Sequence, residues 1–339
     1  MKLRLLYLPI EGYLGDQVAT RAAFEKMLET GRLEAYEAFS FLCEYRHLGN
    51  WDRMLEKLLE VATAFQPTAI FWELQASGRV PKEFTRKLKN LASHPVISQR
   101  TGDSYWNPPK SMVEFGREID VTFLTGSTLI PGFQKAGCKD VRLLPERLDT
   151  LRFGKPWKRT GHPDFDVVMI ANYYKQLWFR RFPGQTDRLR LVKAFTKNFG
   201  KRFGLFGRGW EGQPCWQGVV PYEKQQEPMR NSWLVLGVNN WNHVHYFSDR
   251  LLNSLSSGVP VLYKYFPGAE DFFKDGVHCR FFYETEEAVP KAVEMLDSPE
   301  EVRERIGGDG AEIAIKEHSV ERRTEQLLDI LESLYERQK

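Results

Sequence analysis

The segment from residue 245 to residue 273 contains the side chains best suited to bind an anion. Ser248 precedes a predicted short helix, Arg250 lies in the first turn of that helix, and Gly258 ends it. The free N–H groups at a helix start, the helix dipole and an arginine together favour a phosphate group. We therefore expect a diphosphate ligand here, and the alternative is a solvated arginine at an ordinary capped helix.

Charge is distributed unevenly along the 339 residues, whose formal net charge is only +3. Residues 151–210 contain 14 Lys and Arg residues against three Asp and Glu residues, which gives this segment a net charge of +11. Residues 1–150 carry +1 and residues 211–339 carry −9. A basic segment of this kind either lines a site for phosphates or forms a surface for a polyanion.

Several classes of protein are disfavoured. No apolar run approaches the roughly 20 residues of a membrane span, and the apolar part of the first residues is too short for a signal peptide, so we expect a cytoplasmic protein. The four cysteines lie far apart without metal-ligand spacing, which predicts buried free thiols. Gly12 and Gly15 do not complete a GxGxxG pattern, and "FGRGW" lacks the Lys-Ser/Thr of a P-loop. Residues 164–166 read DFD and resemble a metal-binding DxD motif. They precede a predicted strand, however, whereas ligands bind at the carboxyl ends of strands in such sheets.

Hydrophobic periodicity predicts an α/β protein with two successive doubly wound parallel sheets. Apolar strands alternate with helices in the first half, and the pattern starts again after the proline-bearing residues 154–164. We expect residues 1–155 to form an acceptor-side Rossmann-like domain, residues 163–317 a second such domain, and residues 318–339 a helix that packs back toward the first. Because such sheets bind ligands at the carboxyl ends of their strands, the two domains should face each other across a cleft.

The second half of the chain resembles the C-terminal domain of GT-B glycosyltransferases, in particular the CgeB-like and group 1 members. The resemblance is carried, in order, by Asn172-Tyr173, Arg188, Gly207-Arg-Gly-Trp210, Ser248-Asp-Arg250, Gly258 and Pro267-Gly-Ala-Glu270. A looser similarity links the chain to the phage DNA β-glucosyltransferase, which modifies hydroxymethylcytosine. The resemblance implies the GT-B fold and a nucleoside-diphosphate sugar donor, a UDP-sugar first of all.

The resemblance also implies which residues bind the donor. Arg188 and Arg250 would bind the diphosphate, together with Ser248 and His245, and His243 is a further candidate. The residues that would contact the ribose and the base are Asn253, Gly207, Val219, Val220 and Tyr222. Many relatives have a glutamate at the position of Asn253, so ribose recognition is less certain than phosphate recognition. Cations and a helix dipole can stabilise a leaving diphosphate alone, so we expect neither a metal nor a cofactor.

An inverting transfer also needs a carboxylate that takes the proton of the acceptor hydroxyl. Our candidate is Asp103, which follows a predicted strand end beside Tyr105 and Trp106, two aromatic residues that could shelter a sugar or an extruded base. The phage enzyme has an aspartate that acts as the base in a comparable loop, so the similarity implies the same role for Asp103. Asp103 could equally be an Asx-turn residue, and Asp16 and Glu73 are the alternative bases. A retaining reaction would need no separate base.

The sequence therefore predicts a metal-independent glycosyltransferase. The specific acceptor we expect is a hydroxymethylated base in double-stranded DNA, because residues 151–210 and 81–100 are basic. The near-neutral charge of the rest of the acceptor-side domain argues against DNA. The alternatives are an enzyme that glycosylates a cell-surface polysaccharide, a protein or a small molecule, a nucleotide-sugar epimerase of the same fold, and a sugar- or nucleic-acid-binding protein without turnover.

Overall fold

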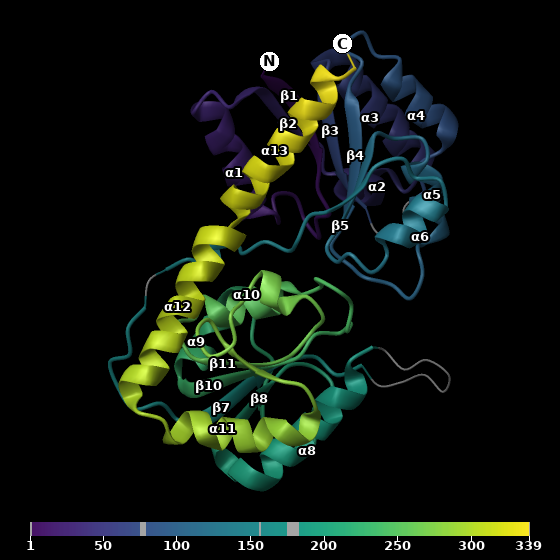
Figure 1. The fold of residues 1–339 in the computed structure, drawn as a ribbon. Helices are drawn as coiled ribbons and strands as arrows, with labels where there is room; N and C mark the ends of the chain where they lie inside the picture. The colour runs from purple at the N-terminus through teal and green to yellow at the C-terminus, as the bar shows by residue number, and fades with distance from the viewer. Residues whose placement is uncertain (1, 75–78, 156, 175–182, 339) are drawn as a thin grey trace. The chain divides into compact units, whose positions relative to one another are not determined.

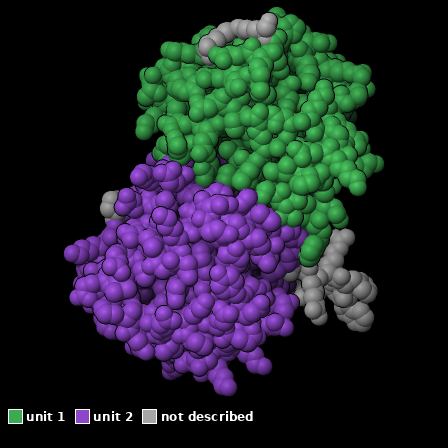
Figure 2. All heavy atoms as spheres, viewed as in Figure 1, with its two compact units in different colours: residues 1–145, 320–339 green, residues 146–319 purple. Residues whose placement is uncertain are grey.

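The chain folds into two compact units, residues 1–145 with 320–339 and residues 146–319, which Figure 2 distinguishes by colour. The computed structural model describes residues 2–74, 79–155, 157–174 and 183–338. Each unit contains a six-stranded parallel sheet, and helices lie between most successive strands (Figure 1). The prediction of two doubly wound parallel sheets is therefore confirmed. No helix in the described ranges is both long and apolar enough to cross a membrane.

The first unit has the strand order β2-β1-β3-β4-β5-β6. Its elements are β1 (Leu3–Leu8), α1 (Val18–Glu29), β2 (Leu33–Ala38), α2 (Phe41–Leu48), α3 (Trp51–Phe65), β3 (Ala69–Glu73), α4 (Lys82–Lys89), β4 (Val96–Thr101), α5 (Lys110–Gly116), β5 (Val121–Leu124), α6 (Ile130–Lys135), β6 (Val141–Leu143) and α13 (Val320–Glu336). The side chains of β3 and β4 are buried throughout, as expected for central parallel strands covered on both faces.

The C-terminal helix α13 belongs to the first unit and covers one face of its sheet. Leu327, Leu328 and Leu331 are almost fully buried and join the core formed by side chains of β1, β4 and β5. These positions repeat at the spacing of one helix face. In Figure 1 this helix, in yellow, lies beside α1, with which it is in contact.

The second unit has the strand order β12-β11-β10-β7-β8-β9. Its elements are α7 (Thr150–Phe153), β7 (Phe165–Ile170), α8 (Gln185–Phe199), η1 (Gly200–Arg202), β8 (Phe203–Phe206), β9 (Trp216–Gly218), η2 (Tyr222–Lys224), α9 (Gln226–Arg230), β10 (Ser232–Gly237), α10 (Asp249–Leu255), β11 (Val261–Lys264), η3 (Ala269–Asp271), β12 (Arg280–Phe282), η4 (Thr285–Glu287), α11 (Ala288–Asp297) and α12 (Glu300–His318).

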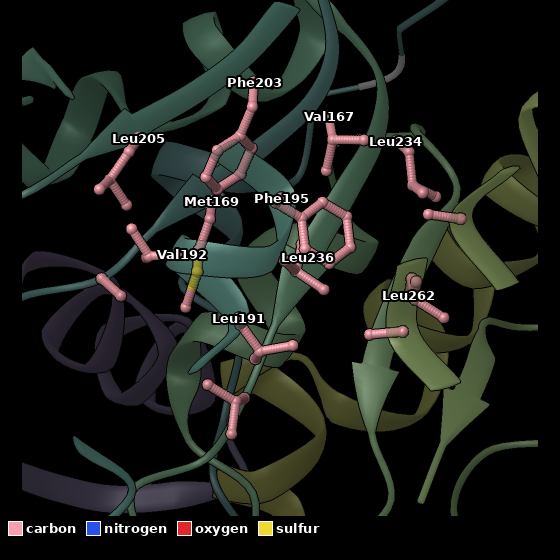
Figure 3. Close-up of a cluster of buried hydrophobic side chains, with 14 of the residues drawn as sticks. Val167, Met169, Leu191, Val192, Phe195, Phe203, Leu205, Leu234, Leu236 and Leu262 are labelled. Carbon is pink, nitrogen blue, oxygen red and sulfur yellow. The ribbon is translucent and has the colours of Figure 1, made fainter. Parts of the chain in front are cut away.

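One core of the second unit lies between its sheet and the helices α8 and α11 (Figure 3). Alternate side chains of β7, such as Val167 and Met169, meet Leu191 and Phe195 from α8, and all four are at most 1% exposed. This burial fixes α8 on the sheet. The first turn of α8 is therefore held at the carboxyl ends of β7 and β10, where ligands bind in sheets of this kind.

A buried carboxylate network stabilises the loop that follows β1. Glu11 is 0% exposed and accepts hydrogen bonds from Arg21 at 2.8 and 2.9 Å, from the Ser40 hydroxyl at 2.5 Å and from the Gln17 amide at 3.2 Å. Burial alone would raise the pKa of Glu11, but these hydrogen bonds outweigh it and hold the pKa below its usual value. The ionised form of Glu11 is thus favoured by folding.

This network predicts a pH-dependent stability. A carboxylate whose folded pKa is lowered stabilises the fold above its usual pKa, near 4, and this contribution disappears as the pH falls through the folded pKa. Glu11→Gln should therefore lower the free energy of unfolding by about 2 kcal/mol at pH 7, and the deficit should be smaller at pH 3. Urea titrations at both pH values measure this difference. The exposed Glu29→Gln is the matched control on α1, and an equal deficit for Glu11→Gln at both pH values contradicts the assignment.

The four cysteines are free thiols, as predicted from their spacing. Cys138, Cys215 and Cys279 are buried, whereas Cys43 is half-buried on α2, so the expectation of burial is wrong for Cys43. Within the described residues, no group of three or more His, Cys, Asp and Glu side chains is arranged to hold a metal ion.

Candidate functional site

Arg188 lies in the first turn of α8, almost completely buried, with 1% of its surface exposed. Its Nη1 donates to the carbonyl of Asn172 at 2.7 Å, and its Nη2 donates to Oδ1 of Asn240. Asn172 follows β7 and Asn240 follows β10, so the guanidinium group joins the loops that leave two neighbouring strands. Arg188 is therefore held in a fixed position at the carboxyl edge of the sheet.

The backbone before Arg188 explains how α8 approaches these loops so closely. Gly184 caps the helix in the left-handed conformation, with φ of 73°. A Cβ atom at this position would lie 2.6 Å from the carbonyl oxygen of Asn239 and 3.0 Å from Cα of Asn240. Glycine is thus required both for the conformation and for the contact. The start of α8 and the loop after β10 form one rigid surface.

Arg250 is the second positive charge of this surface. It lies in the first turn of α10, and its Nε and Nη2 atoms are buried without a hydrogen-bond partner in the described structure. Burial, and after it the positive charge of Arg250, lowers the pKa of Arg188 to about 9. Neither arginine forms an ion pair with a described residue. Arg188 is buried and Arg250 is half-buried, and two like charges with unpartnered N–H groups are expected of a site that binds an anion.

Asn239, rather than a serine cap, holds the start of α10. Its Oδ1 accepts the amide of Ser248 at 3.2 Å and the hydroxyl of Tyr263 at 2.9 Å, and its Nδ2 donates to the carbonyl of Tyr246 at 3.0 Å. Ser248 is the N-cap residue as predicted, but its hydroxyl makes no capping hydrogen bond. The Ser248 hydroxyl is buried beside Tyr263 and Arg250. It is therefore not used to cap the helix.

His245 is fixed beside η3. Its backbone has φ of 61°, an uncommon conformation for a residue with a side chain. Its Nε2 lies 2.8 Å from Oδ2 of Asp271, and its ring lies directly over Gly268, where a Cβ atom would come within 2.2 Å of Cδ2. Burial lowers the pKa of His243, which favours its neutral form. His245, which the sequence analysis placed at the diphosphate, is thus already in contact with the carboxylate of Asp271.

The predicted ribose and base residues divide into two groups. Asn253 is fully buried on α10, and its Nδ2 donates to the hydroxyl of Tyr222 at 3.4 Å, while its Oδ1 has no partner among the described residues. Val219 and Val220 follow β9 at the edge of the sheet, and Val219 is 52% exposed. The structure therefore brings Asn253 and Tyr222 together. Oδ1 of Asn253 is able to accept a hydrogen bond from a ribose hydroxyl.

Gly207 has a structural explanation. It has φ of 132°, and a Cβ atom there would lie 2.1 Å from the carbonyl oxygen of Ala171. Trp210 is buried and donates from Nε1 to the same carbonyl at 2.6 Å. The Gly-x-Gly-Trp motif therefore packs the loop after β8 against the loop after β7. This packing alone explains why glycine is required at position 207, and no contact with a nucleotide is needed to explain it.

In the first unit, Asp103 and Glu73 have opposite environments at the carboxyl ends of β4 and β3. Asp103 is exposed, and its backbone amide donates to the Thr101 hydroxyl at 3.2 Å. Glu73 is 4% exposed, with Arg100 at 2.9 Å and the Tyr7 hydroxyl at 2.7 Å from its carboxylate oxygens. Because Glu73 is already ion-paired and hydrogen-bonded, it is poorly placed to accept another proton.

The remaining acceptor-side residues also lie in loops of the first unit. Asp16 accepts the amide of Gly12 at 3.1 Å, which closes its own loop. Trp106 is 72% exposed, and Tyr105 is half-buried against the cluster around α5 and α6. Of the three candidate bases, Asp103 is the one whose carboxylate is exposed. The rigid aromatic wall expected beside it is limited to Tyr105, because Trp106 extends into solvent.

Sequence reasoning missed Asn239 and Asn240. Both follow β10, and together they hold the start of α10 and Arg188. The available signal was the pair of asparagines directly after a buried apolar strand, at the position where ligands bind in parallel sheets. The importance of these residues depends on contacts with residues 184–188 and 263, which sequence spacing does not reveal.

Comparison with known proteins gives matches to both the sequence and the fold. Residues 185–329 match the family described as glycosyl transferase-like. HepE of Anabaena, solved with UDP and glucose, aligns over 98% of this chain and 100% of its own, with a TM-score of 0.62 and 13% identity. A glycosyltransferase from Rickettsia africae aligns over 98% of each chain, with a TM-score of 0.65 and 9% identity.

A trehalose-6-phosphate synthase studied for glycosyl transfer with retention aligns over 97% of this chain and 99% of its own, with a TM-score of 0.64 and 10% identity. No curated protein matches the sequence. At these identities the solved structures establish the fold, and the family match is confined to residues 185–329. The chain therefore has the GT-B fold, and its residues 185–329 match the glycosyl transferase-like family.

Proposed function

We propose that the protein transfers glucose from UDP-glucose to an acceptor hydroxyl, and that the diphosphate binds between Arg188 and Arg250. The observation that carries this proposal is the pair of guanidinium groups, one buried and one half-buried, without an ion-pair partner among the described residues. A diphosphate would neutralise both charges and accept their free N–H groups. The choice of UDP-glucose is supported by HepE, which has been solved in complex with UDP-glucose.

In the proposed reaction, the bond between the anomeric carbon and the diphosphate oxygen breaks, and its electron pair leaves with UDP. The two arginines stabilise the negative charge that develops on this leaving group. The acceptor oxygen forms the new bond to the anomeric carbon, and its proton passes to the carboxylate of Asp103 if the reaction inverts configuration. Tyr222 and Asn253 bind the ribose or the base of the donor.

An assay of UDP release from a panel of nucleotide sugars tests this function. We expect UDP release from UDP-glucose, faster than nucleotide release from GDP-mannose, and we expect EDTA to leave the rate unchanged because arginines replace the metal. Interconversion of the free UDP-sugar without an acceptor would identify an epimerase instead. Binding of UDP-glucose without any turnover would identify a binding protein and contradict the proposal.

For the acceptor, we propose that the screen begins with hydroxymethylated DNA and extends to polysaccharide and protein. Helix α4 presents Lys82, Arg86 and Lys87 to solvent, which suits a polyanion. Not every basic residue of segments 81–100 and 151–210 is available to DNA, because Arg100 and Arg188 are buried and cannot contact its phosphates. Residues 175–182, in the basic segment, lie outside the described residues. Mass spectrometry of each acceptor after incubation with UDP-glucose identifies the glycosylated class.

A further inference from the structure

A cavity of about 340 Å³ lies in the second unit, away from the arginine pair. It is lined by residue 155 and residues 157–159, by the residues at the starts of β10 and β11, and by one side of α12. The lining side chains are Lys155, Trp157, Lys158, Arg159, Trp233, Ser256, Pro260, Glu300, Arg303, Glu304, Ala311 and Ile315, together with Gly258 and Gly308. Its volume is within the range of sites for small organic ligands.

The cavity lies at the amino ends of the strands of this sheet, and the arginine pair lies at their carboxyl ends. Trp233 is the second residue of β10, whereas Asn239 and Asn240 follow the end of that strand and hold the donor residues. Asn239 lies six positions after Trp233, which corresponds to roughly 20 Å along an extended chain. A molecule in the cavity would therefore not overlap with a nucleotide held at the carboxyl edge.

Tryptophan rings and guanidinium groups alternate around the cavity. The guanidinium carbon of Arg159 lies 4.5 Å from the ring centre of Trp233 and 5.1 Å from that of Trp157. On Trp233, the guanidinium carbon of Arg303 lies at 4.9 Å. Stacking of this kind fixes long side chains that would otherwise move freely. The cavity thus has preorganised walls that combine flat apolar surface with positive charge.

The two arginines are held by neutral groups, so their charge is not cancelled by an ion pair among the described residues. Nη2 of Arg159 donates to the carbonyl of Ser232 at 2.7 Å, and Nη1 of Arg303 donates to the carbonyl of Ser298 at 2.8 Å. Nε of Arg303 is buried without a partner. Glu300 and Glu304 are exposed, also line the cavity and attract the charge of Arg159, but four cations, including Lys155 and Lys158, line the same space.

Gly308 is an exposed residue of the cavity lining. It lies inside α12, where glycine lowers helix stability relative to alanine. Its neighbours Gly307 and Gly310 are explained by packing, because Cβ atoms there would lie 2.2 Å from the carbonyl oxygen of Gly258 and 2.4 Å from that of His278. A Cβ atom at Gly308 would meet nothing within 4 Å, although this residue lines the cavity. The open space at Gly308 therefore allows a larger side chain at this position to enter the cavity without displacing a neighbour.

We propose that this cavity is a second ligand site, for a small anion that carries a flat aromatic ring. The ring would lie against Trp157, Trp233 and Ile315, and the anionic group would bind Arg159 and Arg303. Carboxylate, sulfonate and phosphate groups all match guanidinium donors. Such a ligand binds independently of the sugar donor, so the site does not depend on the donor assignment.

Isothermal titration calorimetry with 1-naphthoate, in the presence of saturating UDP, tests the site. We expect wild-type protein to bind 1-naphthoate and to bind the uncharged 1-naphthalenemethanol at least 10-fold more weakly. Gly308→Trp should fill the cavity and weaken naphthoate binding at least 10-fold. Glu301→Trp is the matched control, because Glu301 is exposed on the same helix and does not line the cavity.

The proposal is overturned if the wild-type protein does not bind naphthoate, if the alcohol binds equally well, or if Gly308→Trp binds like Glu301→Trp. The comparison of acid and alcohol uses wild-type protein alone, so it remains decisive if a variant does not fold. Gly308→Leu provides a smaller filling residue with the same expected loss of binding. UDP affinity should be unchanged in all three variants, which separates this site from the donor site.

Discussion

Replacing Arg250 with methionine is expected to weaken UDP binding by about 100-fold and to raise the melting temperature of the free protein. In the free protein, two of its guanidinium nitrogens are buried without partners, and its charge repels that of Arg188. Removing this charge relieves the repulsion and the unmet hydrogen bonds, which should stabilise the fold by about 1 kcal/mol. Removing the contact with a diphosphate should cost about 3 kcal/mol of binding energy, a loss of about 100-fold.

The two effects have opposite signs, which makes the experiment specific. Calorimetric titration with UDP measures the affinity, and a thermal melt without ligand measures the stability. Arg280→Met is the matched control, because Arg280 is paired with Asp275 at 3.0 Å and lies on β12. We expect that control to keep its UDP affinity and to gain no stability. Wild-type affinity in Arg250→Met, or a lower melting temperature, would show that Arg250 is a structural residue.

The sequence predicts the central strands of both sheets but not the edge strands β2, β9 and β12. β1, β3, β4, β7, β10 and β11 have runs of apolar residues, because both of their faces are covered. By contrast, β2 reads LEAYEA and is half-exposed, and β9 and β12 have three residues each. An edge strand pairs on one side only, so its composition carries a weaker signal than that of a buried strand.

The same contrast separates the parts of the candidate site. Arg250 could be selected from sequence because it lies in the first turn of a predicted helix, where local chemistry is informative, whereas Arg188 was implied by the family resemblance. The partners that hold the site could not be selected in this way. Asn240 contacts Arg188 across 52 positions of the chain, and this pairing follows from the sheet order rather than from local sequence.

Glu73 shows why candidate bases require a structure. From sequence, Glu73 and Asp103 are both carboxylates near strand ends of the same sheet. The structure places Arg100 against Glu73, because β3 and β4 are neighbours and residues 73 and 100 are directly paired across them. The carboxylate of Glu73 is thus neutralised and shielded from solvent, whereas Asp103 lies beyond the end of β4 and is exposed.

Replacing Asp103 with asparagine is expected to lower kcat by roughly 10²–10⁴-fold without changing the affinity for UDP. Asparagine keeps the size of the side chain but cannot accept the proton of the acceptor hydroxyl. The melting temperature should change little, because Asp103 is exposed. The measurement is kcat for transfer to the acceptor found in the screen, together with a thermal melt.

Glu73→Gln provides the opposite pattern in the same unit. It leaves Arg100 buried without its charged partner, which should lower the free energy of unfolding by about 3 kcal/mol. If Asp103 is the base and Glu73 is structural, the first variant loses turnover at constant stability and the second loses stability. A normal kcat in Asp103→Asn would remove Asp103 from proton transfer and favour a retaining reaction, in which the leaving diphosphate held by Arg188 and Arg250 provides the base.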